Sequence, residues 1–382
     1  MTHFPFLQTL TQYPHRGAGT THGREATTLI ATELQKAGFA VELQPFQAPP
    51  TYIPIVYGLI GGLLLGLIAV PWCGWWAVAM TAFFAVNGLL YFDWWPSLCL
   101  YFPPWIKTHN VIGTPPNPSP TLPKLVLMAH YDTAPVSALY QKQTKSGFRN
   151  TLRISMVLMA LTVPVTVGSV YAPESTILLI LRSLLALYLV GQAFLGTVGF
   201  WQKGYTNGAS DNATGVVAAI ETAKNLKNAL KNFSVEVVLT SSEEAGMIGA
   251  YHYWRQTQNQ PNALYLINFD TLGAGNLKVI TQTGSMTTMR YDNAVTQAAF
   301  GIIQQNTQLA HVTAGSWHTA DFDSAWFVRA GVPCVTLAAL DADGLMPRIH
   351  RPEDVLEAVD VKPMQDAITL ATAIGKHLDA LP

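Results

Sequence analysis

The chain has 382 residues, of which 49% are hydrophobic and only 12% are charged. Its 22 basic and 23 acidic side chains nearly cancel, which excludes a nucleic-acid binder that relies on bulk positive charge. The apolar content excludes a disordered chain, and three cysteines without a CxxC pair exclude a disulfide framework and a cysteine-ligated zinc module.

The first polar segment predicts a helix followed by a strand. Apolar residues recur at helical spacing over residues 23–38, which end in a glycine. Residues 39–46 then alternate between apolar and polar side chains, as a half-buried strand does.

Two later blocks are almost free of charge. Residues 43–92 contain no charged side chain, and residues 154–202 contain only Glu174 and Arg182. Each block holds two apolar stretches long enough to cross ~30 Å of hydrocarbon as helices, and core helices seldom run so far without a polar face. We therefore predict two transmembrane hairpins, with spans at 53–70, 72–92, 154–171 and 176–201 and turns at 71–74 and 172–175.

The hairpins, residues 53–92 and 154–201, read as insertions into a single domain formed by residues 1–52, 93–153 and 202–382. Each hairpin crosses the bilayer twice, so the three polar pieces end on one side and can fold together. The basic residues near the span ends lie on the domain side, and the turns carry none, which places the domain in the cytoplasm. These residues are Lys107, Lys142, Lys145, Arg149, Arg153 and Lys203.

The rest of the polar sequence alternates buried strands with helices. After a short strand at 109–113, apolar runs end in polar or acidic groups at 124–130, 235–244, 263–270 and 332–340, and helices are expected at 214–230 and up to Trp254. This alternation predicts an α/β fold with a mostly parallel, mixed sheet covered by helices on both faces. Open sheets of this kind place their sites at the strand C-termini.

Five separated segments place a possible metal ligand at a strand end or in a loop. None is convincing alone, because an HxD pair or a lone histidine is common by chance. Together, two imidazoles and three carboxylates suit Zn²⁺, and their number fits two zinc ions that share one bridging carboxylate. The five segments hold His130 with Asp132, then Asp211, the pair Glu243 and Glu244, Asp270, and His350.

The same segments, in the same order, resemble the co-catalytic dizinc aminopeptidases and their glutamate carboxypeptidase-like and glutaminyl cyclase-like relatives. The resemblance covers nearly all of the polar chain through HNVIG, HYDT, SDNATG, SSEEAGMIGA, NFDTLG and HRPEDV. It implies a zinc aminopeptidase-like fold in which His130 and Asp270 hold one zinc, Glu244 and His350 hold the other, and Asp211 bridges the two.

The resemblance also assigns two residues that hold no metal. Glu243 is implied as the general base that takes a proton from the metal-bridging water, and Asp132 as the residue that orients the His130 ring. The family's bridging aspartate usually precedes a cis peptide, which here would be Asp211–Asn212. His318, Asp321 and Asp323 lie near the expected site, and for them a supporting role and a purely structural one stay equally open.

The predicted function is a membrane-integrated, zinc-dependent metallopeptidase of the aminopeptidase type, acting on a peptide substrate. The second hairpin fills most of the gap between His130 and Asp211, so we hypothesise that the active site faces the membrane and that the substrate is membrane-associated or apolar. Two alternatives stay open. One is a glutaminyl cyclase-like acyltransferase with a single zinc, and the other is a non-catalytic membrane scaffold on the same fold.

Overall fold

Nine strands form one mixed sheet in the described residues, which are 4–119, 121–141, 147–260 and 263–381 of this computed structural model. The sheet order is β1-β2-β4-β3-β5-β9-β6-β7, and β8 pairs with β6. The strands are β1 (Ala40–Ala48), β2 (Ile106–Thr114), β3 (Lys124–His130), β4 (Ser234–Thr240), β5 (Leu264–Asp270), β6 (Asn276–Thr283), β7 (Met289–Arg290), β8 (Thr313–Ser316) and β9 (Cys334–Leu340).

The four central strands, β4, β3, β5 and β9, run parallel to one another. Their near-continuous apolar sequences match their burial, since every residue of β4 and β9 is buried. Antiparallel strands flank them, with β1 and β2 at one side and β6 at the other. This arrangement confirms the predicted mixed α/β sheet.

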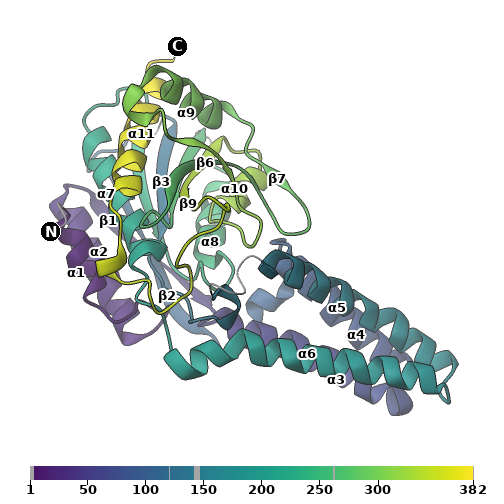
Figure 1. Ribbon diagram of the computed structural model, residues 1–382. Coiled ribbons are helices and arrows are strands. Elements are labelled where there is room, and N and C mark those ends of the chain that lie inside the picture. The colour runs from purple at the N-terminus through teal and green to yellow at the C-terminus, as the bar shows by residue number, and fades with distance from the viewer. Residues whose placement is uncertain (1–3, 120, 142–146, 261–262, 382) are drawn as a thin grey trace.

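Helices cover both faces of the sheet (Figure 1). Alternate side chains of β3 enter different cores, with Leu125 and Leu127 in one and Val126 and Met128 in the other. The first core includes residues of α1 (Pro5–Thr11), α2 (Thr21–Lys36), α7 (Thr214–Leu226), α9 (Ala294–Gln305) and α11 (Lys362–Asp379), and the second includes residues of α8 (Ile248–Thr257) and α10 (Ala325–Arg329).

A bundle of four long helices projects from the α/β part (Figure 1). The helices are α3 (Tyr52–Cys73), α4 (Trp75–Phe92), α5 (Phe148–Tyr171) and α6 (Thr176–Lys203). The predicted turn at 71–74 is wrong in extent, because residues 71–73 complete the last turn of α3. Gly74 alone joins the two helices. Its φ is +50°, which glycine adopts readily because it has no Cβ atom.

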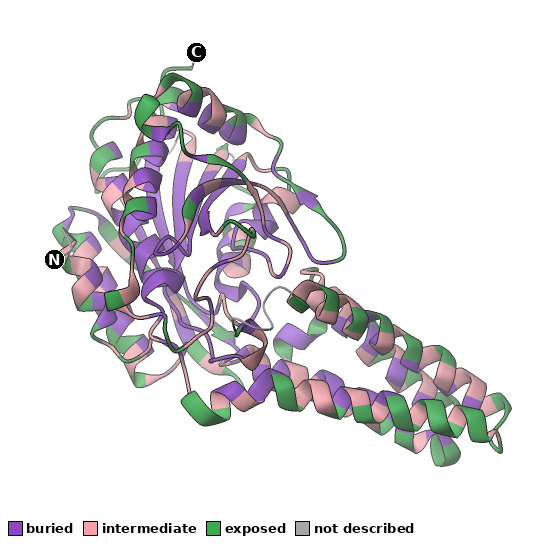
Figure 2. Ribbon diagram, viewed as in Figure 1, coloured by how far each residue is buried: buried purple, intermediate pink, exposed green. Residues whose placement is uncertain are grey.

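The outer surface of the bundle is apolar. Trp76 is 82% exposed and Leu187 is 70% exposed, and many large apolar side chains of the four helices are exposed with them (Figure 2). All four helices are long and apolar enough to cross a membrane. Contiguous exposed apolar surface marks a membrane or partner contact. The division of the chain into one peptidase domain and two inserted hairpins stays a prediction.

The contact between α3 and α4 depends on a glycine. A Cβ atom at Gly66 would lie 2.8 Å from the Thr81 hydroxyl oxygen and 3.2 Å from the Ala77 carbonyl oxygen, both on α4. A Cβ atom at Gly61, one and a half turns earlier on α3, would meet nothing within 4 Å. The two glycines therefore form a matched pair, one at a helix contact and one away from it.

We expect Gly66→Leu to force α3 and α4 apart and to destabilise the purified protein by about 1–3 kcal/mol, as overpacking does. Gly61→Leu adds the same side chain in open space, and we expect it to leave stability unchanged or slightly raised because leucine favours helices. Thermal unfolding in one detergent measures both variants. Equal midpoints for the two would contradict the packing described.

Candidate metal centre

The parallel strands bring the predicted residues to one edge of the sheet. His130 is the last residue of β3 and Asp270 is the last residue of β5, which pairs with it. Glu243 and Glu244 follow β4, the other neighbour of β3. Because parallel strands end at the same edge, these side chains meet there.

Two further segments complete the cluster. Asp211 lies in the distorted turn Ala209–Ala213, directly before α7, and His350 lies in the loop after β9. Asp211 and Asp270 are 3% and 5% exposed, and His130 is 1% exposed. The cluster is therefore largely withdrawn from water.

The five proposed ligands form two groups that share Asp211. In the first group, His130 Nε2 lies 3.2 Å from Asp211 Oδ1 and 3.7 Å from Asp270 Oδ2. In the second, His350 Nε2 lies 3.0 Å from Glu244 Oε2 and 3.5 Å from Asp211 Oδ2. The donor atoms of each group lie within 4.8 Å of one another, so each could surround one metal ion.

The chemistry of the cluster fits a divalent cation. Asp211 Oδ2 and Glu244 Oε1 are buried, and neither has a hydrogen-bond partner among the described residues. Buried carboxylate oxygens without partners are costly, so they are seldom left unpaired unless a metal ion coordinates them. Imidazole nitrogens with carboxylate oxygens are a donor set that zinc accepts.

The electrostatics of the cluster agree with this fit. Burial raises the pKa of Asp270 to about 7, although the nearby His130 opposes the change. Burial alone would lower the pKa of His130, but the carboxylates of Glu243, Asp132 and Asp211 raise it well above its usual value. The cluster thus gathers more negative charge than two imidazoles balance, and bound cations would offset the excess.

Glu243 lies next to both groups, since its carboxylate is within 4.8 Å of donor atoms of His130 and Glu244. Its Oε2 is 3.9 Å from His130 Nε2, while its neighbour Glu244 is directed at His350. A third combination, His130 with Glu243 and Glu244, also brings donor atoms within 4.8 Å. His130 Nε2 is closer to the carboxylates of Asp211, at 3.2 Å, and Asp270, at 3.7 Å, than to that of Glu243.

Asp132 contacts both the imidazole and the glutamate loop. The backbone oxygen of Asp132 lies 3.2 Å from His130 Nδ1, and its carboxylate lies 3.7 Å from the same atom. The carboxylate also accepts hydrogen bonds from the backbone N–H groups of Glu243, at 3.2 Å, and Glu244, at 3.4 Å. The resemblance implied the contact between Asp132 and the His130 ring. Nothing in the sequence indicated the hydrogen bonds from the Glu243 and Glu244 backbone to Asp132.

The segment around Asp211 has the predicted cis peptide bond, Asp211–Asn212. The Asn212 side chain donates to the Phe269 carbonyl at 2.9 Å, and Asp354 accepts from the backbone N–H groups of Ser210, at 2.7 Å, and Asp211, at 3.0 Å. Burial raises the pKa of Asp354 to about 7. Asp354 was not predicted as a site residue, and its only signal was its place in the HRPEDV motif.

Arg16 is a second residue that the sequence analysis missed. It is fully buried and donates hydrogen bonds of 2.8 Å to the backbone oxygens of Tyr131, Asn207 and Gly208. It thereby joins the loop after His130 to the loop before Asp211. Burial lowers the pKa of Arg16 to about 10, so the guanidinium remains charged at neutral pH.

Tyr140 packs against His350, with ring centroids 4.5 Å apart. The backbone N–H of Ser137 donates to the His350 carbonyl at 3.0 Å, so the segment before the second hairpin holds this histidine in place. His350 itself has a φ of +54°. No spacing in the sequence indicated this contact.

The three residues left open occupy different places. Asp321 lines the cavity in front of the cluster. Asp323 is fully buried and accepts a hydrogen bond from the Thr240 hydroxyl, and burial raises its pKa to about 7. His318 lies outside this cavity, with Nδ1 3.1 Å from the Gly284 carbonyl oxygen.

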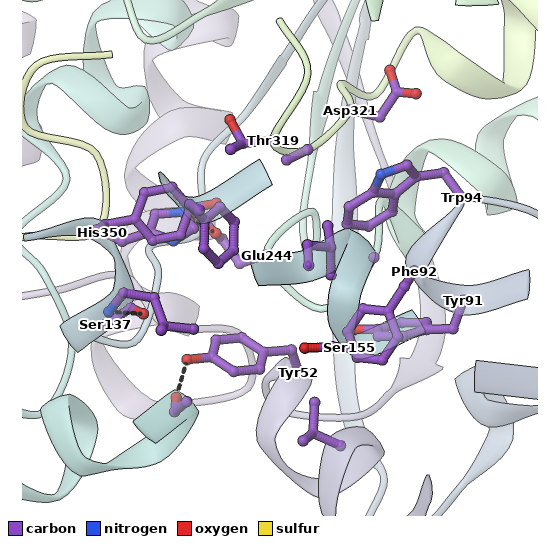
Figure 3. Close-up of a pocket in the computed structure, with 18 of the residues that line it drawn as sticks. Tyr52, Tyr91, Phe92, Trp94, Ser137, Ser155, Glu244, Thr319, Asp321 and His350 are labelled. Carbon is purple, nitrogen blue, oxygen red and sulfur yellow. Dashed lines mark hydrogen bonds and ion pairs between the residues drawn. The ribbon is translucent and has the colours of Figure 1, made fainter. Parts of the chain in front are cut away.

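The cavity in front of the metal ligands is shared with the helix bundle. Figure 3 shows Glu244 and His350 facing it, together with Tyr52 and Tyr91 from the first hairpin. Both hairpins contribute, whereas the sequence analysis placed only the second one near the active site. The Tyr91 hydroxyl donates to the Ala245 carbonyl at 3.1 Å, which attaches α4 to the loop that carries Glu244.

Several known proteins are similar to this chain in sequence or in fold. Residues 188–374 match peptidase family M28. Aminopeptidase YwaD of Bacillus subtilis is 26% identical over 180 residues, which cover 44% of this chain but only 37% of the relative. Among solved structures, the fold is similar to a Bacillus subtilis zinc aminopeptidase, with a TM-score of 0.58, 14% identity and coverage of 98% and 94% of the two chains. It is also similar to a Bacteroides thetaiotaomicron glutaminyl cyclase, with a TM-score of 0.59, 14% identity and coverage of 99% and 96%.

We expect Arg16→Met to destabilise the protein by at least about 2 kcal/mol, because the Tyr131 and Asn207 carbonyl oxygens lose this donor and the Gly208 carbonyl oxygen keeps only the Ala213 N–H. Arg24→Met is the control, since Arg24 is exposed on α2, and it should change stability by no more than about 0.5 kcal/mol. Denaturant unfolding of both variants in detergent measures the difference. Similar losses in the two would show that Arg16 does not join the loops.

Proposed function

We propose that the chain is a membrane-integrated zinc metallopeptidase of the aminopeptidase type, which the match of residues 188–374 to peptidase family M28 supports. The observation that carries this proposal is the pair of ligand groups that share Asp211, with Glu243 beside them. The aligned part spans little more than a third of the curated relative, so the activity is inferred from the site.

In the proposed centre, His130 and Asp270 would hold one zinc ion, Glu244 and His350 would hold the other, and Asp211 would contact both. Bound zinc supplies a Lewis acid that polarises the scissile carbonyl and lowers the pKa of a water molecule. The residue positions are those described above, with each histidine within 4 Å of its carboxylate partners.

Glu243 is assigned the proton transfer. Its carboxylate lies at the edge of the first ligand group, and its backbone N–H is held by Asp132. In this position it can accept a proton from the attacking water and deliver it to the leaving amine. Asp132 keeps the Glu243–Glu244 segment and the His130 ring in fixed relation, and Arg16 does the same for the segment before Asp211.

A glutaminyl cyclase-like activity is the second candidate, because a cyclase shares the fold. The two candidates differ in the expected number of metal ions, since the cyclase-like alternative uses one zinc. The presence of two complete groups of donors, rather than one, favours peptide hydrolysis.

The bundle is proposed to cross the bilayer with the metal centre on the cytoplasmic side. Its length, its apolar composition and its exposed apolar side chains support insertion. The positive-inside rule supports the orientation. Of the basic residues on which the orientation depends, Lys142 and Lys145 lie outside the described residues.

We expect Glu243→Gln to lower peptide hydrolysis by about 10²–10⁴-fold while metal content stays at the wild-type level, because the variant removes only the proton acceptor. Glu244→Gln is the contrast and should lose metal as well as activity. Peptide-library digestion and elemental analysis of the same preparations measure both quantities. Hydrolysis by Glu243→Gln at the wild-type rate would defeat the proposed mechanism.

Elemental analysis also separates the two candidate activities. Two zinc ions per chain, with one lost in His350→Ala, are expected for the peptidase. One zinc per chain, together with cyclisation of an N-terminal glutamine, would favour the cyclase instead.

Labelling of Cys73 tests the proposed orientation in the membrane. It is the exposed cysteine at the end of α3, and Cys99 and Cys334 are buried. With the metal centre in the cytoplasm, a membrane-impermeant maleimide added to intact cells should label the protein at Cys73. Cys73→Ser should remove the label. Labelling only in inverted vesicles would reverse the proposed orientation.

A further inference from the structure

The cavity at the metal centre has two chemically different ends. One end is formed by the proposed zinc ligands and Glu243, and the other is formed by α3, α5 and α6. Residues from both ends line one and the same cavity, which is partly open to the surroundings. A substrate that reaches Glu243 can therefore extend into the helix bundle.

The walls at the bundle end are mostly apolar, although Gln192 of α6 adds one amide group. The residues that line it from the three helices include Val56, Leu59, Ile60, Leu152, Met159 and Leu189. We call this part of the cavity the helix chamber. An occupant of the helix chamber gains by removing apolar surface from water and loses if it buries polar groups without partners.

The hydroxyl groups in the helix chamber walls are already paired within the protein. The Tyr52 hydroxyl donates to the Gly196 carbonyl oxygen at 2.6 Å, as Figure 3 shows, and the Ser155 and Tyr188 hydroxyls lie 2.8 Å apart. These groups do not need a partner from the substrate. The helix chamber thus presents apolar surface while the metal end presents charge.

Gly196 forms an open part of the chamber wall. It is buried on α6 and lines the cavity, yet a Cβ atom there would meet nothing within 4 Å. Gly191 on the same helix has equally open surroundings but does not line the cavity. A side chain added at Gly196 would occupy the helix chamber, and one added at Gly191 would not.

We infer that the helix chamber binds an apolar segment of the peptide substrate while the scissile bond lies at Glu243. This inference rests on the proposed peptidase function and adds the class of substrate. The apolar group is supplied by the substrate's own side chains, which would come from a segment that is stable within the bilayer. A polar segment is disfavoured because the helix chamber offers few groups to replace its water.

The test compares two peptides that share the residues at the scissile bond and differ in one flank, four leucines in one and four serines in the other. With wild-type protein in lipid nanodiscs, we expect kcat/KM for the leucine peptide to exceed that for the serine peptide by at least about tenfold. Gly196→Phe should abolish most of this preference, mainly through KM, and Gly191→Phe should retain it. An unchanged preference in Gly196→Phe, or none in the wild type, would overturn the inference.

Binding separates this inference from the proposed function. A fluorescent leucine peptide is titrated into wild-type protein, Gly196→Phe and Gly191→Phe, without turnover being required. Tight binding that Gly196→Phe alone weakens supports the helix chamber even if no preparation hydrolyses any peptide, and in that case only the peptidase proposal fails. Hydrolysis of both peptides without a difference in binding among the three proteins would overturn the helix chamber and leave the peptidase proposal standing.

A smaller substitution keeps the inference testable if Gly196→Phe fails to fold. Gly196→Cys in a Cys73→Ser background should react with an apolar thiol reagent, and the leucine peptide should slow the reaction by at least about tenfold. The serine peptide carrying a fatty acyl chain is the third arm. Protection by the acylated peptide alone would identify a lipid chain as the occupant and would overturn the assignment to apolar side chains.

Discussion

The carboxylate of Asp211 is the contact around which this structure is organised. Its two oxygens face different histidines, His130 at 3.2 Å and His350 at 3.5 Å, so one side chain joins two groups of donors. Buried charge of this density is stable only when surrounding groups hold it in place. Asp354 and Arg16 do so through the backbone of residues 207–211, which explains why two buried charged residues outside the ligand set belong to the same site.

The helix bundle is part of this site and not a separate anchor. Tyr91 of α4 contacts the glutamate loop, and Tyr140, just before the second hairpin, packs against His350. The first attachment joins α4 to the loop that carries Glu244, and the second joins His350 to the segment that leads into α5. One cavity therefore joins the metal centre to the helix bundle.

The sequence alone supported much of the fold and the list of candidate ligands. The buried strands ending at His130 and Asp270 were recognisable because parallel strands are apolar throughout and place reactive groups at their C-termini. The roles of Arg16 and Tyr140 were not recognisable, because each acts through backbone oxygens or ring packing on residues far away in the chain. Hydrogen bonds to the backbone leave no pattern in side-chain identity.

Composition and spacing by themselves determined that four stretches are long and apolar enough to span a bilayer. They also determined that two imidazoles and three carboxylates stand at strand ends or in loops. Both properties depend on the local order of residues along the chain. Only the tertiary structure decided that Asp211 faces both histidines, that Asp132 holds the glutamate loop, and that the first hairpin joins the second around one cavity. Those contacts link residues more than a hundred positions apart in several cases, and the packing of the sheet and the helices sets them.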